Sequence, residues 1–186
     1  MFNSNVKLIH ADTDTPVFGY TYYNGVGNLT IWLDYSTGVG YWETYIQNAK
    51  NNWMYTGWAN PIYMSFVSSN YGSNMDFYAN DGSMWPQYLG ILAETRFFKN
   101  SVEVEPFEET WKYCNIYIND TAFRASTFSN YDALGTVTHE MGHAIGLAHY
   151  NTNPSSIMCQ LSYERTVNTP QLVDNNAINT LYGYGN

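Results

Sequence analysis

The chain has 186 residues, and 45% of them are hydrophobic, which is enough for one domain spanning residues 1–186 around a single core. Seven Lys and Arg against sixteen Asp and Glu give a net charge of −9. That balance excludes a nucleic-acid-binding protein, because such a protein needs a basic patch to neutralise phosphates. The same balance disfavours binding to anionic membrane surfaces. No apolar run approaches the roughly 18–20 residues needed for membrane insertion.

The polar part of the composition is mostly uncharged. Charged residues make up only 12% of the chain, whereas Tyr alone occurs 18 times. This composition is typical of secreted, extracellular bacterial proteins, and we expect a monomer. The start of the chain, Met1 to Ser4, has neither a basic region nor an apolar stretch. We therefore expect no signal peptide here and a chain in its mature form.

Two cysteines, Cys114 and Cys159, are too few for a disulfide scaffold or a zinc knuckle. Cys packs readily as a small apolar residue, so two buried thiols are as consistent with the sequence as one disulfide bridge. The sequence leaves these two alternatives open.

The N-terminal half predicts strands and one helix. Residues 1–27 are rich in Asn, Thr, Tyr and Gly and predict an irregular entry with one strand near 17–23. Alternation of Leu29, Ile31 and Leu33 with other residue types predicts a strand at 28–35. Apolar spacings of three and four predict a helix at 41–55 that packs on the sheet. Further strands are expected at 62–67, 75–78, 89–98 and 114–118, and a solvated acidic loop at 103–109. Residues 80–82 (Asn-Asp-Gly) could belong to a calcium loop, but a simple turn is the favoured interpretation.

The C-terminal half predicts two helices separated by a loop. Ser129 and Asp132 resemble a capping box ahead of a helix at 134–147. Residues 150–169 show little periodicity and predict a loop. The last helix is expected to start with Thr169 as N-cap and Pro170 in its first position, and to end at Gly183. The fold class is therefore α+β, with an early packing helix, an active-site helix and a C-terminal helix beside a mixed, twisted sheet of about five strands.

The strongest signal in the chain runs from His139 to His149 and reads HEMGHAIGLAH. Because His139 and His143 lie four apart on the expected helix, they share one face and can bind one zinc ion. His149 is too far along to join that face unless the chain turns. Gly146 allows the turn, since glycine adopts left-handed backbone angles at little cost.

Three protein ligands and one open position are typical of a catalytic rather than a structural zinc. Glu140 directly follows the first histidine, where its carboxylate can reach a metal-activated water without being a ligand. It is the expected general base, and it would later protonate the leaving amine. The alternative is a helix that carries histidines on its surface by chance. This alternative is disfavoured because three of the four histidines of the chain fall in one ligand pattern.

This extended pattern resembles the metzincin zinc metallopeptidases. The resemblance implies a Met-turn at Ser156-Ile157-Met158, with Met158 beneath the metal as an apolar floor. From Asn115 to Gly183 the chain is most similar to the matrixins, the group that contains the matrix metalloproteinase catalytic domains, and to their bacterial relatives. Astacins and serralysins usually have a Tyr two residues after this Met, where the present chain has Gln160.

Two departures from the matrixin pattern stand out. Only His10 is left over for a second zinc site, so the structural zinc of mammalian matrixins should be absent. Tyr150 follows the third histidine, where matrixins commonly have Ser or Thr.

The resemblance also implies a protein or peptide substrate. It would lie extended along an edge strand at 91–95, with Leu92 and Ala93 nearest the metal. The wall of the primary specificity pocket would come from the loop after Met158, at Leu161 to Tyr163. A plain core strand at 89–98 fits that segment equally well.

The sequence thus predicts a zinc-dependent endopeptidase that hydrolyses internal peptide bonds of extended protein substrates. Two alternatives stay open: a catalytically inactive zinc-bearing module that binds proteins, and a metal-dependent hydrolase that acts on other bonds. An inactive module would be expected to have lost its general base, whereas Glu140 is intact.

Overall fold

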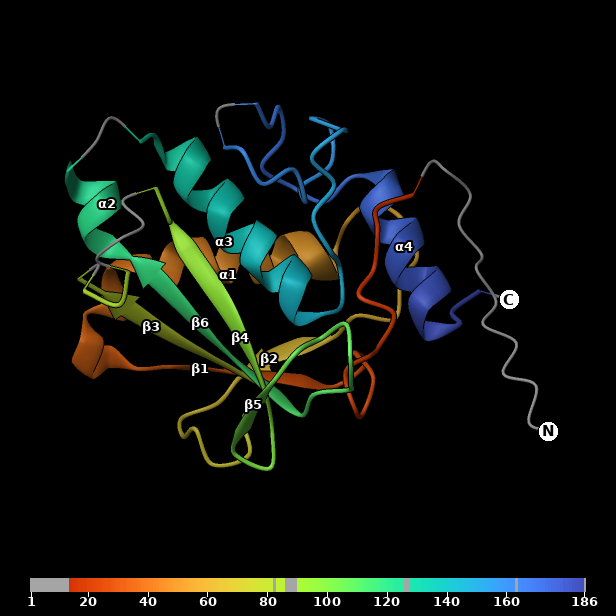
Figure 1. The fold of residues 1–186 in the computed structure, drawn as a ribbon, viewed down its shortest axis with the longest axis horizontal. Helices are drawn as coiled ribbons and strands as arrows, with labels where there is room; N and C mark the ends of the chain where they lie inside the picture. Colours follow the sequence, from red (N-terminus) through yellow and green to blue (C-terminus); the bar gives the residue numbers. More distant parts are fainter. Residues whose placement is uncertain (1–13, 82, 86–89, 126–127, 163, 186) are drawn as a thin grey trace.

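A computed structural model describes residues 14–81, 83–85, 90–125, 128–162 and 164–185 (Figure 1). Its strands are β1 (Leu29–Leu33), β2 (Met64–Phe66), β3 (Met75–Asn80), β4 (Ala93–Lys99), β5 (Val102–Val104) and β6 (Tyr113–Asn119). Its α-helices are α1 (Glu43–Met54), α2 (Asp120–Ala125), α3 (Asn130–Ala144) and α4 (Leu172–Tyr182), and two short 3-10 helices, η1 (Tyr35–Thr37) and η2 (Val39–Trp42), lead into α1. The α+β fold class expected from the sequence is confirmed.

The six strands form one mixed sheet in the order β2-β1-β3-β6-β4-β5. The first four strands of that order are parallel to one another, while β4 runs antiparallel to β6 and β5 antiparallel to β4. Alternate residues of β1 are buried, as its period-two pattern predicts. The sheet has one strand more than the approximate count expected, because β5 is short.

Helices α1 and α3 lie side by side over one face of the sheet, and α4 lies beyond the end of α3 (Figure 1). Ile46, Ala49 and Trp53 of α1 are buried, which follows from their spacing of three and four. The indole Nε1 of Trp53 donates a hydrogen bond of 2.9 Å to the carbonyl oxygen of Thr138 in α3. The early helix therefore supports the helix that carries the histidine motif.

Two expectations for local structure, at 103–109 and near 17–23, are wrong. The acidic segment at 103–109 is not all loop, because Val102–Val104 forms β5. Asn100 and Ser101 both have positive φ values, 54° and 63°, and make the two-residue turn that folds β5 back on β4. The expected strand near 17–23 is only two isolated bridges, from Val17 to Leu147 and from Tyr22 to Trp111.

Helix α4 starts later than expected. Gln171, not Thr169, is its N-cap, because the carboxylate of Asp174 accepts a hydrogen bond of 2.8 Å from the backbone N–H of Gln171. The capping box at Ser129 and Asp132 is confirmed, and α3 accordingly begins at Asn130. Helix α2 was not expected.

Both cysteines are buried free thiols, which resolves the alternative that the sequence left open. Burial raises the pKa of the Cys114 thiol well above its usual value.

Within the described ranges, none of the helices has the length and apolar character that crossing a bilayer requires.

Candidate metal centre

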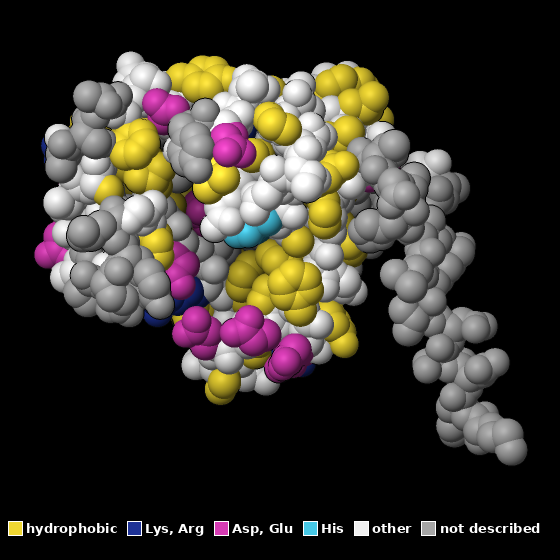
Figure 2. Space-filling model, turned by 45° about the horizontal axis from the view of Figure 1, so that its top comes forward, with side chains coloured by type: hydrophobic (Ala, Val, Ile, Leu, Met, Phe, Trp, Pro, Cys, Tyr) yellow, Lys and Arg dark blue, Asp and Glu magenta, His cyan; other side chains and the backbone are white. Residues whose placement is uncertain are grey.

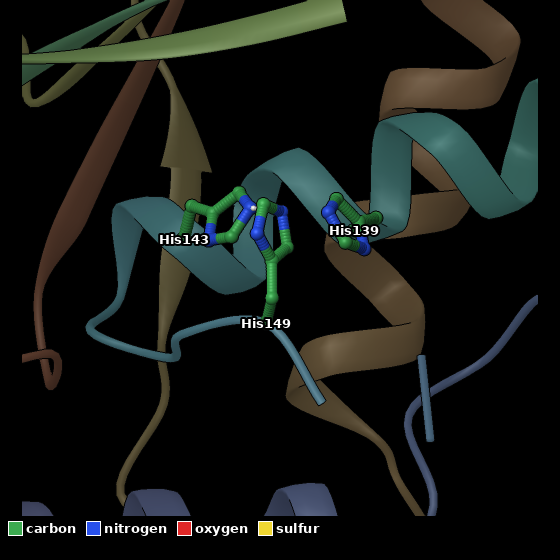
Figure 3. Close-up of side chains that lie close together, drawn as sticks. All are labelled: His139, His143 and His149. Atoms are coloured by element: carbon green, nitrogen blue, oxygen red, sulfur yellow. Dashed lines mark hydrogen bonds between the residues drawn. The ribbon is translucent and has the colours of Figure 1, made fainter. Parts of the chain in front are cut away.

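The structure brings the three motif histidines together. His139 and His143 project from one face of α3, and His149 reaches them from the segment after the helix (Figure 3). One ring nitrogen from each lies within 4.8 Å of the others, and the Nε2 atoms of His143 and His149 are 3.0 Å apart. Tetrahedral zinc with bonds of 2.0–2.1 Å needs nitrogens roughly 3.3–3.4 Å apart. The donor set and its spacing therefore fit one zinc ion.

Backbone carbonyls fix which nitrogen of two rings faces the centre. His139 Nδ1 lies 2.9 Å from the carbonyl oxygen of Ile157, and His143 Nδ1 lies 2.8 Å from that of Leu147. A carbonyl oxygen can only accept, so Nδ1 carries the proton in both rings. Each Nε2 is then left with a free lone pair, as metal ligation requires.

The surroundings also keep these imidazoles neutral. Burial, with a smaller effect from neighbouring positive groups, holds the pKa of His139 well below its usual value. Burial and the nearby His149 lower the pKa of His143 to about 3, and burial lowers the pKa of His149. A metal would not have to displace protons from these rings at neutral pH.

The turn that brings His149 back occurs at Gly146, as the sequence predicts. Its φ of +112° is strained for any residue with a side chain, and a Cβ there would lie 2.5 Å from Cδ2 of Leu181 in α4. The hydroxyl of Tyr182 donates a hydrogen bond of 3.0 Å to the carbonyl oxygen of Ile145. The last turn of α4 thus supports the end of α3.

Met158 is fully buried beneath α3. A Cβ on Gly142 would overlap the Met158 sulfur and would lie 3.0 Å from Cζ2 of Trp53. Gly142 lies between the two helical histidines, so the thioether packs directly under the part of the helix that carries them. The place beneath the metal that the metzincin resemblance implies for Met158 stays a prediction.

A buried carboxylate joins the Met158 segment to α4. Asp174 accepts hydrogen bonds from the hydroxyls of Ser156 and Thr15, both at 2.5 Å, and from the backbone N–H of Ile157 at 3.1 Å. Burial raises the pKa of Asp174, whereas these hydrogen bonds lower it. No local pattern in the sequence marks Asp174 for this role.

Glu140 is buried beside the histidines and is held by β4. The hydroxyl of Thr95 donates a hydrogen bond of 2.7 Å to its Oε2. Burial raises the pKa of Glu140 to about 7, against the opposing effects of Thr95 and of the positive charge of Arg165. Thr95 was not singled out from the sequence, because its partner lies 45 residues away.

The other expected site residues lie as follows. Leu92 directly precedes β4, and Ala93 is its first residue, paired with Ile118 of β6. On its other side β4 pairs with β5 only at Phe97–Lys99, so within the described residues no strand pairs there with 93–96. Leu161 is half-buried after the Met158 segment, and Tyr163 lies outside the described residues.

The surface around the site is mixed in character. Figure 2 shows a histidine side chain exposed on this face, with acidic side chains gathered below it in the view and hydrophobic ones between. His149 is the exposed member of the three, while His139 and His143 are buried. The centre is therefore reached from solvent past His149.

The α+β fold and the three-histidine cluster fit the class of zinc metallopeptidases. The family model for matrixins (Peptidase_M10) matches residues 41–183, and the chain belongs to this family. A similar solved structure is high choriolytic enzyme 1, a hatching enzyme zinc-protease from Oryzias latipes (medaka fish). The two share 14% identity with a TM-score of 0.50 over 94% of this chain and 97% of the other, which is a likeness of fold. No curated protein sequence matches the chain.

Proposed function

We propose that the protein is a secreted zinc-dependent endopeptidase. In this proposal His139, His143 and His149 hold the zinc ion, and Glu140 is the general base. The observation that carries it is the convergence of three neutral imidazole nitrogens, next to a buried carboxylate, within a matrixin chain.

The residues of the chain have separate tasks in the hydrolysis. A bound zinc ion supplies Lewis acidity that favours both ionisation of a water and polarisation of the scissile carbonyl. Glu140, with a pKa near neutrality, accepts the proton from the attacking water and returns it to the leaving amine. Thr95 orients the carboxylate for that transfer. Met158 fills the space under the helix and excludes water from that side.

The substrate in this proposal is an extended segment of a protein. Such a segment could pair with the backbone of 93–96, where β4 has no strand partner among the described residues. Leu92 and Ala93 would then lie nearest the reacting bond, and Leu161 and Tyr163 would contribute to the specificity pocket. The low charged fraction of 12% supports a place outside the cell.

Cleavage of quenched-fluorescence peptides, with and without a chelator, tests the proposal. We expect chelator-sensitive cleavage at neutral pH that zinc restores, and at least about a thousandfold loss in Glu140→Ala with zinc still bound. The matched control is Glu108→Ala, which removes an exposed carboxylate that is distant from Glu140 in the sequence. This control should leave cleavage unchanged.

Zinc content should be measured on each variant by atomic absorption. Zinc bound by the wild type without any peptide cleavage would instead favour the inactive binding module. Full activity in Glu140→Ala would refute the role of this residue.

A further inference from the structure

Arg165 is a buried cation that forms no salt bridge within the described residues, although the carboxyl groups of Glu140 and Asp132 lie near enough to act on its charge. Its side chain lies in the segment after Met158, and the residue is only 7% exposed. The one hydrogen bond of its side chain among the described residues runs from Nη1 to the carbonyl oxygen of Cys159, at 3.3 Å. Among the residues that the structure describes, the arginines that form salt bridges are Arg96 and Arg124. A buried charge is costly unless an opposite charge compensates it, so this guanidinium calls for an explanation.

The guanidinium lies against the face of α3 that carries the histidines. A Cβ on Gly135 would be 2.7 Å from Nη2 of Arg165. Gly135 is one turn before His139, and residues four apart share a helix face. Glycine at this position therefore makes room for the guanidinium next to the first metal ligand.

The charge of Arg165 acts on the site itself. After burial, which has the larger effect, Arg165 helps to lower the pKa of His139, and it opposes the raised pKa of Glu140. Burial lowers the pKa of Arg165 from its usual value, but arginine stays protonated in proteins. A positive charge thus persists beside the general base.

The chain around Arg165 holds it in place. Its backbone N–H donates a hydrogen bond of 2.9 Å to the carbonyl oxygen of Leu161. The next residue, Thr166, donates from its N–H to Pro154 at 2.8 Å and accepts from the hydroxyl of Tyr131 at 2.7 Å. These hydrogen bonds hold the backbone around Arg165 close to Tyr131 of α3.

We propose that Arg165 is a specificity-determining residue that binds the carboxylate of an Asp or Glu side chain next to the scissile bond. The inference rests on the proposed peptidase function. A substrate carboxylate would give Arg165 the directly hydrogen-bonded anion that it does not have among the described residues, through a charge-assisted hydrogen bond that can be bidentate. Lys at the same substrate position would face a like charge, and an apolar residue would offer the guanidinium no hydrogen-bond acceptor.

Cleavage profiling of a peptide library by the zinc-loaded enzyme tests this. At one of the two positions flanking the cut, we expect kcat/KM for Glu or Asp to exceed that for Gln or Asn by about tenfold or more. Arg165→Met should abolish this preference and favour apolar residues, and Arg165→Lys should keep part of it. Arg124→Met removes an exposed arginine ion-paired with Asp120, and this matched control should keep the wild-type profile.

A binding measurement separates this inference from the proposed function. Fluorescence anisotropy with zinc-loaded Glu140→Ala should show tighter binding of the Glu peptide than of its Gln twin by about tenfold, a gap that narrows with added salt. Cleavage by the wild type without any acidic preference would overturn the role of Arg165 and leave a structural one, whereas no cleavage at all would overturn the peptidase. If Arg165→Met fails to fold, the cleavage profile of the wild type and the affinities for the Glu and Gln peptides still test the role of Arg165.

Discussion

The thioether of Met158 rests directly on the backbone of Gly142, in the turn of α3 between the two helical histidines. Any side chain at Gly142 would have to displace this sulfur or the indole of Trp53. We expect Gly142→Ala to lower the free energy of unfolding by about 1–3 kcal/mol and to weaken zinc binding. Urea denaturation and a zinc titration measure these two effects.

The control for Gly142→Ala is Gly90→Ala. A Cβ on Gly90 meets no atom of the described residues within 4 Å, so this substitution should change neither quantity. Equal effects of the two substitutions would show that the contact between Gly142 and Met158 is unimportant.

Thr95 should affect turnover more than folding. Thr95→Val keeps the shape of the side chain but removes the hydroxyl that donates to Glu140, and a hydrogen bond to a charged group contributes about 1.5–3 kcal/mol. We expect kcat to fall about tenfold or more with little change in thermal unfolding. Thr95→Ser retains the hydroxyl and should restore most of the rate, and an unaffected kcat in Thr95→Val would count against the contact.

Asp174 should determine the stability of the segment that carries Met158. Oδ2 of Asp174 accepts from the backbone N–H groups of Ile157 and Gln171. Its Oδ1 accepts from the hydroxyls of Ser156 and Thr15. In Asp174→Asn, we expect a loss of about 2–4 kcal/mol in the free energy of unfolding, because four hydrogen bonds to a carboxylate become weaker bonds to a neutral amide and both hydroxyls must turn to accept. Denaturant unfolding checks this, with Asp14→Asn as the matched control; similar midpoints for the two variants would contradict it.

Asp76 should make stability depend on pH. Burial raises the pKa of this carboxyl to about 6, opposed by the hydrogen bond from Ser73, against an ordinary value near 3.8. The folded state therefore holds the proton more tightly than the unfolded chain, and the stabilisation from this group is lost as pH rises from about 4 to about 6.

Asp76→Asn removes that titration while an amide oxygen can still accept from Ser73. The variant should gain roughly 1–3 kcal/mol relative to the wild type between pH 4 and pH 7. Paired urea denaturations at the two pH values measure the gain. A difference between the two proteins that does not change with pH would rule out a role for Asp76.

Local patterns in the sequence predicted most of what places the histidines. The spacing of His139 and His143, the glycine at 146 and the capping box at Ser129 are all features of neighbouring residues, and the structure confirms the helix and its turn. Alternation predicted β1, and apolar spacing predicted α1. Such elements are predictable because the physics that forms them acts over a few residues.

Other parts of the site depend on residues that are distant in the sequence. Thr95 meets Glu140 only because β4 lies beside α3, and Asp174 meets Ile157 only because α4 folds back. Nothing near Arg165 in the sequence marks it as buried. By contrast, Asp120 and Arg124 four residues apart are a signal that could have predicted α2.

The support that the end of α4 gives to Gly146 has a consequence for shortened chains. Leu181 and Tyr182 are among the last residues, yet they touch the bend from which the third imidazole is presented. A chain shortened to end at Thr180 would keep the contacts of the sheet with α1 and α3. The turn at Gly146 would lose its contacts with Leu181 and Tyr182. The affinity for metal should therefore fall while the chain is still folded. A tag or a proteolytic cut at this end should likewise weaken metal binding before it lowers the stability of the fold.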